Sequence, residues 1–266
     1  MDVSTAFDTF RALQAAWRAI KQAPVPLLVG GVLLAITSGG GGGGGPGFQG
    51  RFDASEADWE EIVPLMLPFL AVACCLGLVF FVVSSWLLVG FANSVEETLR
   101  TGRGDVGTLF DSRGRFADML LARLFAALIQ VGALLPFALA VGLLVFAADE
   151  GAIPEEVAVV VGIGLGLVGF VLGVYVALGF AFVSEAVALE GLAPGAALRR
   201  SWGFASGNRL RFLLYFVVLW IVTVLGICAC CVGYLFTASL ARVAAVESWL
   251  AVTPVSYTHL TLPTKA

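Results

Sequence analysis

The chain has 266 residues, of which 59% are hydrophobic and 13% charged, and its mean hydropathy is +0.97. These fractions lie outside the usual range of soluble domains, so the composition favours a protein that crosses a membrane several times. The formal net charge is −4, and the sequence contains no run of basic residues, which excludes the usual signature of a nucleic-acid-binding protein.

Residues 1–22 are predicted to form an N-terminal amphipathic helix, with the helix itself at 4–21. Its larger apolar residues share one side: Phe7, Phe10, Leu13, Trp17 and Ile20. Because Arg11 and Arg18 lie beside this apolar side, we expect the helix to rest on the membrane surface rather than to cross it.

Residues 23–254 are predicted to form an all-α transmembrane bundle with six crossings and further amphipathic interfacial helices. The crossings are expected at about 24–38, 62–92, 125–148, 157–187, 209–226 and 233–250. A helix rises about 1.5 Å per residue and needs about 20 apolar residues to span the hydrocarbon core. The segments 62–92, 125–148 and 157–187 exceed that length, whereas the first is short.

One crossing carries a regular pattern of small residues. In the 157–187 segment, small side chains fall on one face of a helix: Gly162, Gly166, Gly169, Gly173 and Ala177. In lipid, a small face lets helix backbones approach closely. We therefore predict that this helix is central and packs through that face.

Two glycine-rich sequences superficially resemble nucleotide-binding loops. The run Gly39–Gly45 lacks the Lys-Ser/Thr of a phosphate loop, and we expect it to be a flexible loop. The GxGxxG pattern at 164–169 interrupts a long uncharged run, whereas a dinucleotide-binding motif needs a strand, a turn and an amphipathic helix. No cofactor is predicted.

The distribution of basic residues predicts the orientation. With six crossings, all arginines and lysines before residue 255 except Arg51 fall on one side of the membrane. By the positive-inside rule both termini are then cytoplasmic, and with the arginine-rich composition we expect a bacterial inner membrane protein.

The connection before the fifth crossing is predicted to be a basic interfacial helix. Arg199, Arg200, Arg209 and Arg211 are candidates for contact with anionic lipid headgroups. Glu185 ends the preceding crossing, and Arg199 or Arg200 is within reach of it, so a structural ion pair is the favoured interpretation.

The sequence offers no assembled set of catalytic groups. Its one histidine, His259, lies in residues 255–266, a polar segment that resembles translated sequencing adapter and that we interpret as an adapter-derived tail. The cysteine spacing does not match a zinc site. We therefore predict neither enzymatic activity nor a metal site, although a cytoplasmic site built from Asp105, Asp111, Glu185 and arginines stays an alternative.

The stretch 182–208 resembles a known family. It contains Glu185, Ala197-Leu198, Ser201-Trp202 and Gly207-Asn208 before the next helix. This pattern is similar to the membrane domain attached to some bacterial glycerophosphodiester phosphodiesterases and to stand-alone relatives of unknown function. The resemblance implies a helical bundle with paired crossings and cytoplasmic connecting helices. It does not imply phosphodiesterase activity, because the catalytic barrel has no counterpart here.

These features favour a non-enzymatic inner-membrane protein with a structural, interaction or accessory role. Its expected partners are the lipid bilayer and other membrane proteins or a second copy of the chain. The alternative is an uncoupled transporter or lipid-handling protein, which would need a membrane-depth cavity lined by Gln130, Tyr175 or Thr223.

Overall fold

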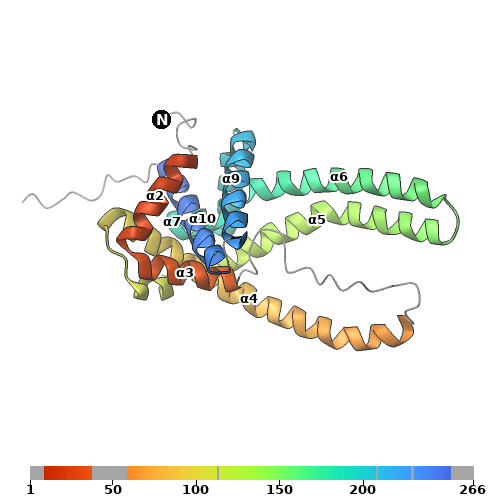
Figure 1. Ribbon diagram of the computed structural model, residues 1–266, viewed down its shortest axis with the longest axis horizontal. Coiled ribbons are helices and arrows are strands. Elements are labelled where there is room, and N and C mark those ends of the chain that lie inside the picture. The colour runs from red at the N-terminus through yellow and green to blue at the C-terminus, as the bar shows by residue number, and fades with distance from the viewer. Residues whose placement is uncertain (1–8, 38–58, 113, 208, 229–230, 253–266) are drawn as a thin grey trace, which may run out of the picture. The chain divides into compact units, whose positions relative to one another are not determined.

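The computed structural model describes residues 9–37, 59–112, 114–207, 209–228 and 231–252. These residues form helices joined by short connections, with no strand in the described ranges, which confirms the predicted all-α class (Figure 1). The chain divides into two compact units: Met1–Phe116 with Val218–Pro254, and Ala117–Val217 with Val255–Ala266. The polyglycine run and the predicted adapter-derived tail lie outside the described residues.

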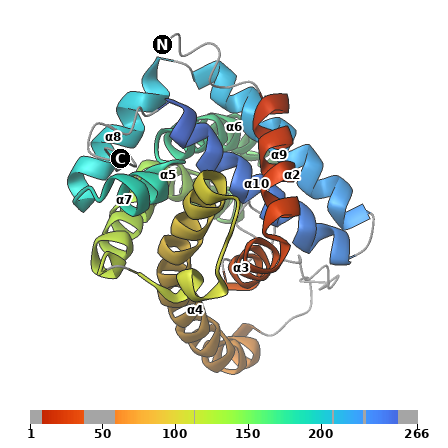
Figure 2. The same ribbon diagram turned by 90° about the vertical axis from the view of Figure 1, so that its left-hand side faces the viewer.

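The first unit is assembled from both ends of the chain. Its elements are α2 (Thr9–Gln22), α3 (Pro24–Thr37), α4 (Trp59–Thr101), the 3₁₀ helix η1 (Val106–Phe110) and α10 (Cys231–Val252). α10 packs against α2, α3 and α4, and Figure 2 shows these four helices gathered together. At Ala23 the chain turns between α2 and α3, whose axes are bent by 115°.

α2 buries its alanines and Ile20, whereas its aromatic residues are more exposed. Ala12, Ala16 and Ala19 are almost completely buried, whereas Phe10 is 75% and Trp17 44% exposed. Small side chains allow α2 to lie close to α10, and the Trp17 ring makes an edge-to-face contact with the Phe236 ring of α10, with ring centroids 5.6 Å apart. The sequence pattern therefore identified Ile20 and Trp17, which pack in the structure, but it did not identify the buried alanines.

Charged residues also join α2 to α10. The positive charges of Arg11 and Arg18 act on the carboxylate of Glu247, which is partly buried near the end of α10. This attraction opposes the larger cost of withdrawing the carboxylate from water.

The two halves of α4 have different surroundings. Residues 71–80 are exposed on every side, although all are apolar, whereas Val89, Ser94 and Thr98 in the second half are fully buried. With 43 residues at about 1.5 Å each, α4 is roughly 65 Å long. The predicted crossing at 62–92 is thus part of a longer helix that continues to Thr101.

The second unit contains a long helical hairpin. α5 (Phe116–Asp149) and α6 (Glu155–Gly179) run antiparallel and are joined by a tight link (Figure 1). α5 continues as one helix through Pro136. The short helices α7 (Val183–Glu190) and α8 (Pro194–Ser206) follow, and α8 packs on α6 and α7. α9 (Arg209–Cys228) begins in the second unit and ends in the first.

The segment predicted as one crossing at 157–187 is not one continuous helix. α6 ends at Gly179, residues 180–182 form a turn, and α7 begins at Val183. The backbone N–H of Phe180 bonds within the end of α6, while that of Phe182 donates to the Ser201 hydroxyl. Contacts made by α8 therefore determine the break, and the local apolar sequence did not reveal it.

Among the described residues, four helical segments are long and apolar enough to cross a membrane: Leu67–Thr101, Phe116–Asp149, Glu155–Glu190 and Arg209–Gly226. The bent pair formed by α2 and α3 provides a fifth candidate if it is counted as one span. α3 alone has 14 residues and is only about 21 Å long. α10 is not among these candidates, and Arg242 and Glu247 interrupt its apolar sequence. The total of six crossings stays a prediction.

Candidate functional site: an arginine and aromatic cluster

Ser201 on α8 holds the break between α6 and α7. Its hydroxyl donates to the Gly179 carbonyl at 2.8 Å and accepts from the Phe182 N–H at 3.3 Å, and the side chain is buried. The two backbone groups lie where the α-helical hydrogen bonding is interrupted, so they need other partners. The Ser201 hydroxyl is the partner of both backbone groups, and these two hydrogen bonds hold α8 beside the end of α6.

Trp202, the next residue on α8, fills the space beside α6. Its ring lies on the backbone of Gly179 and makes an edge-to-face contact with Tyr175, with ring centroids 5.8 Å apart. The ring of Phe180 lies 5.3 Å away at a tilt. Adjacent residues of α8 thus have two roles, because Ser201 bonds the backbone and Trp202 packs against it.

Arg209, the first residue of α9, completes this cluster. Its guanidinium carbon lies 3.5 Å from the centroid of the Tyr175 ring and 4.7 Å from that of Trp202. Both contacts are within the range of cation–π attraction. The Nη1 atom is buried and, in the described part of the chain, has no hydrogen-bond partner. We call Tyr175, Trp202 and Arg209 the arginine–aromatic cluster.

The other predicted headgroup contacts have different environments. Arg199 and Arg211 are exposed to the surroundings. The Nε atom of Arg200 lies 3.4 Å from a carboxylate oxygen of Glu190. Arg209 therefore differs from the other three arginines, since it is partly buried between aromatic rings.

Glu185 is buried on α7 and accepts a hydrogen bond of 2.8 Å from the Ser184 hydroxyl. Its predicted pairing with Arg199 or Arg200 stays a prediction, and the ion pair that the structure shows for Arg200 uses Glu190. Sequence reasoning did not single out Glu190, although its position four residues before Pro194 places it at the end of α7, close to α8.

The predicted small face of α6 is only partly covered. A Cβ built on Gly169 would lie 3.1 Å from Phe137 of α5, and one built on Gly173 would lie 3.1 Å from Leu134. Ala177 is partly buried, whereas Gly162 and Gly166 face open space. The close packing of α6 on α5 is thus concentrated in the half of the stripe nearer to α8.

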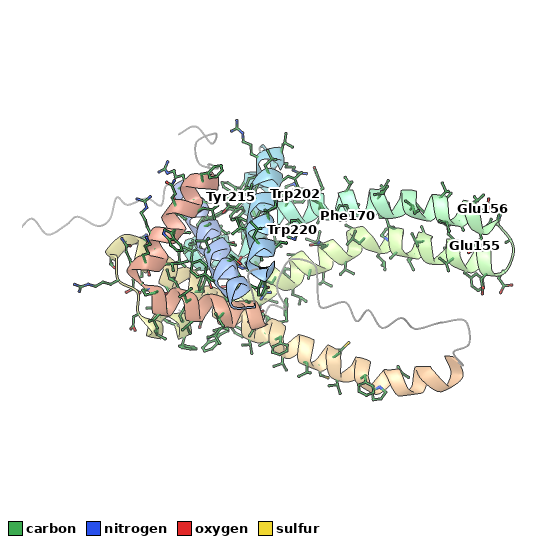
Figure 3. The ribbon with its side chains drawn as sticks, in the orientation of Figure 1. Glu155, Glu156, Phe170, Trp202, Tyr215 and Trp220 are labelled. Carbon is green, nitrogen blue, oxygen red and sulfur yellow. The ribbon has the colours of Figure 1, made fainter. Side chains whose placement is uncertain are left out.

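The hairpin has oppositely charged ends. Asp149, Glu150, Glu155 and Glu156 surround the link between α5 and α6, and Figure 3 shows the last two at the tip. No charged residue follows Glu156 on α6, and the basic α8 packs on the other end of that helix. With 25 residues at about 1.5 Å each, α6 is roughly 37 Å long, slightly more than the hydrocarbon core of a bilayer.

Asp105 and Asp111, two acidic residues singled out from the sequence, make structural contacts. The Asp105 carboxylate accepts from the Gly107 N–H and caps η1, and the Asp111 carbonyl accepts from Asn93 at 3.3 Å. Cys74 and Cys75 are free and exposed. Within the ranges that the structure describes, no group of three His, Cys, Asp or Glu residues is arranged to hold a metal ion.

Comparison with known proteins gives a family without an assigned activity. No curated protein and no solved structure matches the chain significantly. The resemblance to the membrane domain of glycerophosphodiester phosphodiesterases therefore stays a prediction. A family model does match, and it covers residues 8–262, nearly the whole chain. The chain belongs to the family described as Domain of unknown function (DUF7847).

Proposed function

We propose that the chain is an integral membrane protein without enzymatic activity, which acts as a structural, interaction or accessory component of a bacterial inner membrane. Its main partner is the lipid bilayer, and the basic end of the second unit, with both termini, faces the cytoplasm. Several long apolar helices are compatible with a membrane protein.

The charge distribution along the α5–α6 hairpin carries this proposal. Four carboxylates cluster at its tip, the basic α8 packs at the other end, and α5 has no charged residue between Arg123 and Asp149. The outward side chains between these ends are apolar, including Phe170 at 68% exposure and Leu143 at 69%. Such a surface is stable in lipid and unfavourable in water. The positive-inside rule places the basic end in the cytoplasm.

Cysteine labelling tests the proposed orientation. Ala152→Cys lies in the link between α5 and α6, and Ser206→Cys lies at the end of α8; both positions are exposed. In intact spheroplasts a membrane-impermeant maleimide should modify the first variant, and it should modify the second only after permeabilisation. The parent protein gives the background from its five native cysteines. The opposite pattern of labelling contradicts the orientation.

The absence of enzymatic activity is tested separately. Purified protein in detergent is incubated with phospholipids and soluble phosphodiesters, and we expect no turnover above that of a protein-free micelle. Turnover that is lost in Asp105→Asn or Glu185→Gln would overturn the proposal and favour the cytoplasmic enzyme alternative.

A further inference from the structure

We infer that the arginine–aromatic cluster binds the phosphate group of an anionic phospholipid. This rests on the proposed membrane location and deepens it, because it replaces a general attraction by basic residues with one defined site. Arg209 supplies the charge, while Tyr175 and Trp202 hold its guanidinium in place.

The position of Arg209 matches the level of lipid phosphates. It is the first residue of the candidate span Arg209–Gly226. Two of the leucines that follow it face outward, with Leu210 71% and Leu214 57% exposed. These side chains would lie in the acyl region, so the guanidinium lies at the boundary with the headgroups. Tyrosine and tryptophan are the residue types that favour this boundary.

The electrostatic environment of Arg209 favours an anionic ligand. Arg200 has Glu190 as a counter-ion, whereas the described residues provide no carboxylate for Arg209, and its Nη1 donor is buried without a partner. An ionised group away from water is costly unless it is paired and hydrogen-bonded. A phosphate would neutralise the guanidinium and accept hydrogen bonds from it.

The aromatic contacts favour arginine and a phosphate in particular. The planar guanidinium presents its N–H donors in a fixed fork that matches two oxygens of a phosphate, and its flat face stacks on aromatic rings. Stacking on Tyr175 at 3.5 Å restricts the rotation of the side chain before any ligand binds. Less conformational entropy is then lost on binding. A zwitterionic lipid carries a positive group next to its phosphate, so a net anionic lipid is the better ligand.

Native mass spectrometry of full-length, delipidated protein in neutral detergent tests this site. The probe is phosphatidylglycerol, with phosphatidylcholine as the zwitterionic reference of zero net charge. Arg209→Gln should lower the affinity for phosphatidylglycerol about tenfold, the loss expected for a hydrogen bond to a charged group. The matched control is Arg211→Gln, an exposed arginine of the same helix, which should change the affinity less than about twofold.

Two further variants keep the test decisive. Arg209→Lys retains the charge and removes the fork, so its affinity should lie between those of wild type and Arg209→Gln. Tyr175→Leu removes the ring on which the guanidinium stacks, so it should lower the affinity for phosphatidylglycerol, by less than Arg209→Gln does. Circular dichroism and the melting temperature show whether each variant is folded. If Arg209→Gln does not fold, the comparison of Arg209→Lys with Arg211→Lys is made in place of the comparison between the two glutamine variants.

The outcomes separate this inference from the proposed function. Equal binding by wild type and Arg209→Gln, or equal losses in Arg209→Gln and Arg211→Gln, overturns the site. If inorganic phosphate alone displaces phosphatidylglycerol, the lipid is overturned as the ligand of the cluster, and the ligand is a soluble phosphate compound. Extraction of the protein from membranes by carbonate would contradict the membrane location. Native mass spectrometry in detergent tests Arg209 independently of that location.

Discussion

The indole ring of Trp202 lies against the bare backbone of Gly179, in the space that a β-carbon at residue 179 would occupy. This contact places α8 at the end of α6 and brings the Trp202 ring to Tyr175 and Arg209. A single glycine at the end of a long apolar helix therefore determines the geometry of the candidate site.

Gly179→Ala should destabilise the second unit and displace Trp202. The added methyl group would overlap the indole ring, and overpacking of this kind costs about 1–3 kcal/mol. Gly166→Ala is the control, because the same helix offers open space there. Thermal unfolding in detergent measures both variants. Equal melting temperatures for the two would show that the ring moves aside freely.

Gly90→Ala should destabilise the first unit for a related reason. A β-carbon at residue 90 of α4 would meet the backbone carbonyl of Leu109 in η1, and backbone cannot rotate away as a side chain can. We expect a loss of about 1–3 kcal/mol in denaturant titrations. Gly77→Ala on the same helix faces open space and should be neutral or slightly stabilising, since alanine is the better helix former. A neutral Gly90→Ala would contradict the described approach of α4 and η1.

Ser201→Ala should loosen the turn between α6 and α7. The substitution removes a buried hydroxyl that pairs with both the Gly179 carbonyl and the Phe182 N–H. Each buried backbone group that is left unpaired costs about 1–3 kcal/mol. Hydrogen exchange at Phe182 should accelerate. Ser206→Ala, which removes an exposed hydroxyl on the same helix, should leave that exchange unchanged.

Ala16→Leu should separate α2 from α10. Ala16 is fully buried in α2, which packs on α10, and a larger side chain at this position would force neighbouring elements apart at a cost of about 1–3 kcal/mol. The melting temperature should fall, and limited proteolysis should cut sooner within α2. Gln14→Leu adds a leucine at an exposed position of the same helix and should change neither readout. Identical behaviour of the two variants would mean that the alanine face does not carry the packing.

The small-residue face of α6 was predicted from sequence spacing alone. The spacing of Gly169 and Gly173 predicted a face for close helix packing, and the structure places Phe137 and Leu134 of α5 against it. The same pattern included Gly162 and Gly166, which face open space. Periodicity identifies residues that share a helix face, but it does not say how far along that face a neighbouring helix extends.

The sequence by itself determined the all-α class and the presence of several long apolar helices, because the length of an uncharged run and the spacing of its residues are local properties. Only the tertiary structure decided that α6 breaks after Gly179, that α2 packs through its alanines, and that Arg209 stacks on Tyr175 and Trp202. Each of these depends on residues from another helix, and contacts between segments distant in the chain leave no periodic signal in either segment.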